Sequence, residues 1–84
     1  MNKAKARELT VRVDAFYRNY VMNPWDFTSE ELLEANLATY DLIKEGNVQG
    51  LVDELIKELE YIEDERVVAE GRDLVCDIME AVNG

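Results

Sequence analysis

The chain has 84 residues, 48% of them hydrophobic, which fits one compact domain over residues 1–84 and leaves no room for two separate cores. Nine basic and nineteen acidic residues give a net charge of −10. Such a charge is repelled by nucleic acid and anionic membranes and attracted to basic surfaces. We therefore expect no direct contact with nucleic acid or membrane.

The charge is distributed unevenly along the chain. Residues 1–22 hold five bases and two acids, whereas residues 23–84 hold four bases and seventeen acids. The first segment is therefore weakly basic, and the remainder of the protein is strongly acidic.

No segment of the sequence predicts membrane insertion or secretion. No stretch approaches the roughly 18 consecutive apolar residues that a membrane span needs, and the first residues lack the apolar run of a secretory signal. The only cysteine, Cys76, cannot form an intrachain disulfide, which is usual in a reducing compartment. We expect a cytoplasmic protein.

Residues 3–22 are predicted to form an amphipathic helix. Its apolar residues recur at spacings of four, three and four: Leu9, Val13, Phe16 and Tyr20. Two acid–base pairs at i,i+4 are expected on its polar face: Glu8 with Arg12, and Asp14 with Arg18. Pro24 disfavours helical geometry at Asn23 and ends the segment.

The stretch "NPWDFTSEEL", residues 23–32, predicts a corner followed by a helix start. Thr28 is the expected N-cap, and Glu31 three residues later completes a capping box. Phe27, directly before the cap, fits a hydrophobic staple. That leaves Trp25, which we interpret as a lid over one end of the bundle core, with an exposed binding hot spot as the alternative.

The second helix is predicted over residues 29–45, with Gly46 as a left-handed C-terminal cap. Five residues share one broad apolar face: Leu32, Leu33, Leu37, Tyr40 and Ile43. Three more fall on its other side: Ala35, Ala38 and Leu42. We therefore expect this helix to be covered by more than one neighbour. Asn47 is the expected N-cap of the following helix.

Two further helices are predicted over residues 48–62 and 65–82. Both carry apolar stripes at helical spacing, and Gly71 in the last stripe would permit a close approach between helices. A step of five residues breaks the phase between the stripes, so we expect a turn with Asp64 as N-cap. The alternative is one continuous helix, whose long apolar stripe would require a dimer. The sequence thus predicts an all-α fold, a small bundle of four helices.

No residue is expected to be catalytic, to ligate a metal or to bind a cofactor, and we predict a non-enzymatic protein. The absence of histidine removes the commonest general base and metal ligand. The sequence contains no glycine-rich phosphate loop and no calcium loop. Cys76 lies near Asp73 and Glu80 in helical register, and these carboxylates disfavour a reactive thiolate.

Two rows of acids are the most distinctive surface feature that the sequence predicts. The second helix carries one row: Glu30, Glu34, Asp41 and Glu45. The last helix carries another, whose only nearby base is Arg66 at one end: Glu70, Asp73, Asp77 and Glu80. Neighbours in this second row are about 5 Å apart along the axis, near the phosphate spacing of a nucleic-acid strand. The rows form either a binding surface or the ordinary solvated faces of an acidic bundle.

The leading hypothesis is a protein-binding module whose acidic helical surface engages a basic surface of a partner protein, as a DNA-mimic or other nucleic-acid-mimic inhibitor would. The alternative is a homo-oligomeric structural or regulatory protein, such as a homodimer, whose acidic faces are only solubilising. Its interface would use four surplus apolar residues: Trp25, Val68, Val75 and Met79.

Overall fold

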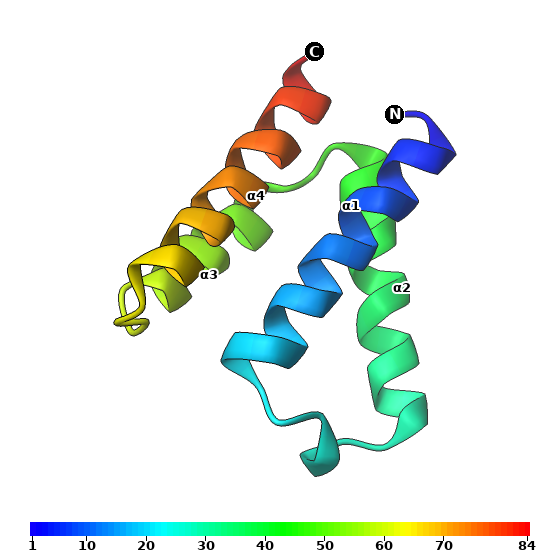
Figure 1. Ribbon diagram of the computed structural model, residues 1–84. Helices are drawn as coiled ribbons and strands as arrows, with labels where there is room; N and C mark the ends of the chain where they lie inside the picture. Colours follow the sequence, from blue (N-terminus) through cyan, green and yellow to red (C-terminus); the bar gives the residue numbers. More distant parts are fainter.

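The computed structural model, which describes all 84 residues, confirms an all-α fold without strands. Its four α-helices are α1 (Lys3–Phe16), α2 (Ser29–Glu45), α3 (Gln49–Leu59) and α4 (Glu65–Asn83). Figure 1 shows two antiparallel pairs, α1 with α2 and α3 with α4, and both chain termini at the same end of the molecule. The Cα atoms extend over 31 × 31 × 19 Å, so the two pairs form a flat body.

The first helix begins at a side-chain cap and ends in a widened turn. The side-chain oxygen of Asn2 accepts hydrogen bonds from the backbone N–H groups of Ala4 and Lys5. After Phe16 the chain makes one π-helical turn, Tyr17–Val21. The predicted helix over residues 3–22 is therefore regular in its first fourteen residues only.

The ends of α2 follow the local sequence signals. The backbone N–H of Thr28 donates to a Glu31 carboxylate oxygen at 3.0 Å, and the Glu31 N–H donates to the Thr28 hydroxyl at 3.1 Å, which confirms the capping box. Gly46 has φ 79°, which confirms the left-handed C-terminal cap. The predicted cap at Asn47 is wrong, because α3 begins after Val48 without a side-chain cap.

The last two helices are separate. A turn divides α3 from α4, and the Asp64 carboxylate accepts a hydrogen bond from the Arg66 N–H at 2.9 Å. The predicted turn and cap are thus confirmed, and the continuous helix is excluded. A side chain at Gly71 would clash with Leu59 and would lie 3.0 Å from the Phe16 ring, so this glycine does permit the close approach that we expected.

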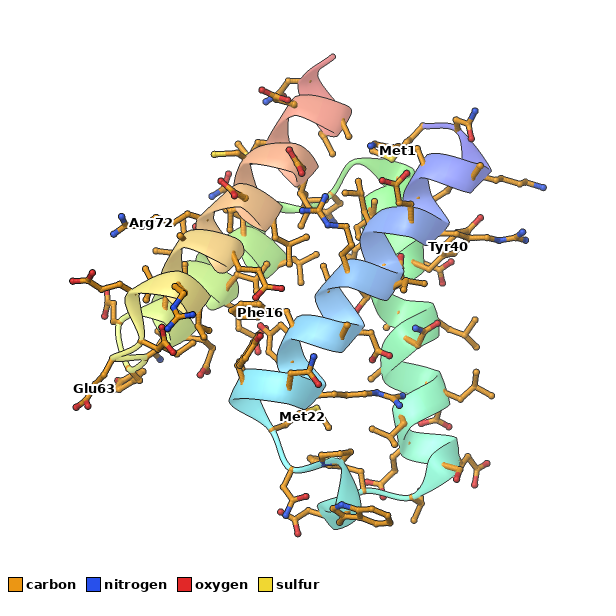
Figure 2. All side chains as sticks on the ribbon, viewed as in Figure 1. Met1, Phe16, Met22, Tyr40, Glu63 and Arg72 are labelled. Carbon is orange, nitrogen blue, oxygen red and sulfur yellow. The ribbon has the colours of Figure 1, made fainter.

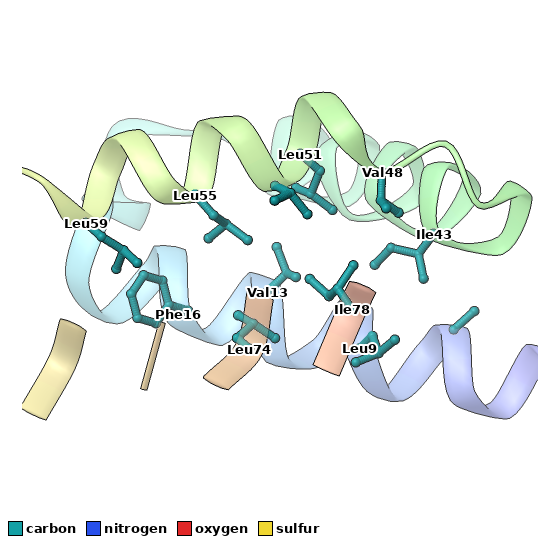
Figure 3. Close-up of a cluster of buried hydrophobic side chains, with 12 residues drawn as sticks. Leu9, Val13, Phe16, Ile43, Val48, Leu51, Leu55, Leu59, Leu74 and Ile78 are labelled. Carbon is teal, nitrogen blue, oxygen red and sulfur yellow. The ribbon is translucent and has the colours of Figure 1, made fainter. Parts of the chain in front are cut away.

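The core consists of twelve buried apolar residues, and α1, α3 and α4 supply most of them. Figure 3 shows side chains of α1 facing those of α3 and α4, and Figure 2 shows Phe16 extending from α1 toward the α3/α4 pair. The core residues are Ala6, Leu9, Val13, Phe16, Ile43, Val48, Leu51, Val52, Leu55, Leu59, Leu74 and Ile78. Only 14 of 84 residues are buried, so each core side chain carries a large share of the stability.

Helix α2 is attached on one side only. It packs against α1, and in Figure 1 no helix lies on the side of α2 that faces away from α1. Of its apolar residues only Ile43 is buried, whereas Leu33 is 58% exposed and Leu37 is 53% exposed. The expectation that more than one neighbour covers α2 is wrong. Helix α1 packs against both α2 and α4, so α4 covers α1 and leaves the outer side of α2 exposed.

Adjacent residues of α3 test this packing. Leu55 is fully buried and Ile56 is 46% exposed. We expect Leu55→Ala to lower the free energy of unfolding by about 2–5 kcal/mol, because it leaves a cavity in the core. Ile56→Ala should lower it by less than about 1 kcal/mol. Urea unfolding followed by circular dichroism measures both, and equal losses would contradict the observed register of α3.

Candidate functional site

The acidic residues of α2 form the clearest candidate for a binding surface. The α2 acidic row consists of Glu30, Glu34, Asp41 and Glu45, and all four residues are exposed. None of them takes part in an ion pair, because the three ion pairs of the protein use other acids. Sixteen of the nineteen acids are thus unpaired, and the α2 acidic row is a free negative surface.

The acidic row of α4 is partly occupied by contacts with α1. Arg12 of α1 donates a hydrogen bond to the Asp77 carboxylate at 2.6 Å. The prediction that only Arg66 lies near this row is therefore wrong at Asp77. The predicted pair of Glu8 with Arg12 is also wrong, since Glu8 lies 3.6 Å from Lys5 instead.

The remaining ion pair and acids complete the charge layout. Arg18 lies 3.1 Å from Asp14, which confirms the second predicted pair of α1. The nearby Glu70 carboxylate raises the pKa of Tyr20, because it favours the protonated hydroxyl. Asp73 and Glu80 are exposed and have no ion pair. Within the α4 row, then, Asp77 pairs with Arg12 of α1 and Glu70 lines a small hollow with Arg12, Ala15 and Phe16 of the same helix.

An exposed apolar strip, which the sequence did not predict, lies beside the α2 acidic row. A groove of about 330 Å³ between α1 and α2 is lined by Arg7, Thr10, Val11, Asn36, Leu37 and Tyr40. An adjoining hollow shares Asn36 with it and is lined in addition by Arg18, Ser29, Leu32 and Leu33. Val11, Leu33 and Leu37 are each more than half exposed, and we call these three residues the α1/α2 apolar strip. The helical pattern assigned both leucines to a buried face, so only the packing of α2 exposes them.

Trp25 does not cover the core. Its side chain is 91% exposed in the short 3₁₀ turn Pro24–Asp26, which joins α1 to α2. The Asn23 side chain accepts a hydrogen bond from the Trp25 N–H at 3.1 Å and fixes this turn. The interpretation of Trp25 as a lid is therefore wrong, and the indole is free for contact with another molecule.

The other predicted interface residues lie elsewhere. Val68 and Val75 are half-buried in a second groove, of about 470 Å³, between α3 and α4. Its full lining is Ile56, Leu59, Glu60, Val68, Arg72, Val75 and Cys76. Figure 2 shows Arg72 pointing outward from this side of the molecule. Cys76 is exposed, and Met79 is half-buried outside this lining.

Comparison with known proteins identifies no relative. No protein-family model matches the chain, and no curated protein or solved structure is detectably similar to it. None of its helices combines the length and the apolar character that crossing a membrane requires. No group of three or more acidic or cysteine side chains is arranged to hold a metal ion.

One buried polar atom has no partner. The Tyr17 hydroxyl oxygen is inaccessible to solvent and forms no hydrogen bond. Burial raises the pKa of Tyr17, and the nearby carboxylates of Glu54 and Glu58 raise it further. An unpaired buried hydroxyl lowers the free energy of unfolding, because the group loses its hydrogen bonds to water and gains none in the protein.

Replacing Tyr17 by Phe tests this description. Because the folded-state pKa is raised, the tyrosine ionises more readily in the unfolded chain, so the free energy of unfolding is unaffected by this titration below pH 10 and falls as the pH rises above it. We expect Tyr17→Phe to leave the free energy of unfolding at pH 7 unchanged or to raise it by up to about 1 kcal/mol. The variant should lose less stability than the wild type between pH 9 and 11. A destabilised variant at pH 7 would show that the hydroxyl has a partner.

Proposed function

We propose that the protein is a non-enzymatic binding module whose α2 acidic row engages a basic surface of a partner protein. The single observation that carries this proposal is that all four acids of the row are exposed and unpaired on a helix covered on one side only. Unpaired acids at i,i+4 repel one another, at a cost of a few tenths of a kcal/mol per pair. A basic partner would convert that repulsion into attraction.

The geometry of α2 suits such a contact. The row runs from Glu30 to Glu45, a length of about 22 Å at a rise of 1.5 Å per residue. A capping box and a left-handed glycine fix the two ends of the helix, so the carboxylates lie on a rigid support. Ordering costs on binding are then low. A basic patch that otherwise binds nucleic acid carries the complementary charge. A more specific form of the proposal is therefore a nucleic-acid-mimic inhibitor.

A second function, self-association, is favoured by the groove between α3 and α4. Val68 and Val75 line it, and Ile56 at its edge is 46% exposed. In a homo-oligomer built on this groove the acidic rows would have no partner. Light scattering after gel filtration distinguishes the two functions, because only self-association gives a mass above that of one chain.

Neutralising the α2 acidic row tests the main proposal. The variant carries Glu30→Gln, Glu34→Gln, Asp41→Asn and Glu45→Gln. The probe is a lysine 20-mer, titrated by calorimetry at low salt. We expect the affinity to fall about ten-fold or more, because each exposed charge pair contributes about 0.2–1 kcal/mol and a ten-fold change is about 1.4 kcal/mol.

The control variant has the same net charge as the neutralised variant but keeps all four acids of the α2 acidic row. It carries Glu54→Gln, Glu60→Gln, Glu63→Gln and Glu65→Gln, all at exposed positions outside α2. Its affinity for the probe should stay within about three-fold of the wild type, and wild-type binding should weaken steeply with added salt. Equal losses in both variants would mean that net charge, and not the row, attracts the probe.

A further inference from the structure

The α1/α2 apolar strip and the α2 acidic row lie side by side on the same helix. Glu30 precedes Leu33 by three residues, and Asp41 follows Leu37 by four, spacings that place the side chains next to each other on a helix surface. Leu33 and Leu37 are themselves four residues apart. The outer face of α2 is therefore amphipathic, with two exposed leucines along one edge and acids along the other.

The apolar strip is not a scatter of single exposed residues. Val11 on α1 and Leu37 on α2 line the same groove, and Leu33 lines the hollow that adjoins it. Exposed apolar residues that border one groove mark an interaction site more often than isolated ones do. The leucines at i,i+4 and the groove beside them match the way proteins hold the apolar face of an amphipathic helix.

The charges around the strip select the occupant. Acids lie along its α2 edge, whereas Arg7 lines the groove on the α1 side. Arg18, further along α1, is already paired with Asp14 at 3.1 Å. The basic side chains of a bound helix would be attracted to the acids at the α2 edge, and Arg7 would repel them from the α1 side. A second copy of the chain would instead bring another net charge of −10 to this face.

From these observations we infer that the outer face of α2 binds a basic amphipathic helix of a partner protein, with the partner's apolar side on Val11, Leu33 and Leu37 and its basic side over the α2 acidic row. This inference rests on the proposed function and specifies the partner. It adds an apolar contact, so part of the affinity persists at a salt concentration that screens the charges.

Two synthetic peptides of identical leucine and lysine composition test the inference. In the first the leucines recur at i, i+3, i+4 and i+7, and in the second they are spread around the helix. We expect the wild type to bind the first peptide at least ten-fold more tightly than the second at 150 mM salt. The double variant Leu33→Ser, Leu37→Ser should bind both peptides equally, and Arg7→Gln should tighten binding of the first.

Matched variants keep the test independent of folding. Ile56→Ser changes a residue of similar exposure in the other groove and should retain the preference for the first peptide. Val11→Ser, at a position 63% exposed on α1, should reduce the preference without any change in α2. Thermal unfolding followed by circular dichroism confirms that each variant is folded.

The alternative outcomes are distinguishable. Equal, salt-sensitive binding of both peptides would overturn the amphipathic-helix inference and leave the electrostatic proposal standing. Binding of neither peptide at low salt would overturn both. A dimeric wild type that Leu33→Ser, Leu37→Ser converts to a monomer would show that a second copy occupies this face. Loss of the preference in Ile56→Ser alone would place the peptide in the α3/α4 groove and would also overturn the inference.

Discussion

The apolar stripe of α1 is the constraint on which the rest of the structure depends. Ala6, Leu9, Val13 and Phe16 are all buried, and α1 contacts α2 on one flank and α4 on the other. A chain of 84 residues has too little apolar surface to enclose every helix. Because α1 packs against both α2 and α4, only α1 covers α2, and the outer face of α2 stays in contact with solvent.

The same packing decides which acids remain available. Helix α4 lies against α1, so Arg12 reaches Asp77, and Glu70 lies near enough to Tyr20 to raise the pKa of that tyrosine. Helix α2 also packs on α1, but no base of α1 forms an ion pair with an acid of the α2 row. Two rows that look alike in the sequence therefore differ in the folded protein. The α2 acidic row has no ion pair, and it lies beside exposed leucines.

Local signals in the sequence predicted the elements well, whereas contacts between elements were harder to predict. The caps at Thr28, Gly46 and Asp64 depend on residues within a few positions of each helix end, and all three were predicted correctly. Leu33 and Leu37 were assigned to a buried face, because a helical wheel shows where apolar residues lie but not how many neighbours exist. The pairing of Arg12 with a residue 65 positions away has no local signal at all.

The most direct test of this description is nuclear magnetic resonance of the labelled protein during titration with the lysine–leucine amphipathic peptide. If the bare outer face of α2 is the binding surface, the largest shift changes will fall on the methyl groups of Leu33 and Leu37 and on the backbone amides of residues 30–41. Smaller changes will appear at Val11. Shift changes centred on Ile56, Val68 and Val75, with α2 unaffected, would contradict it.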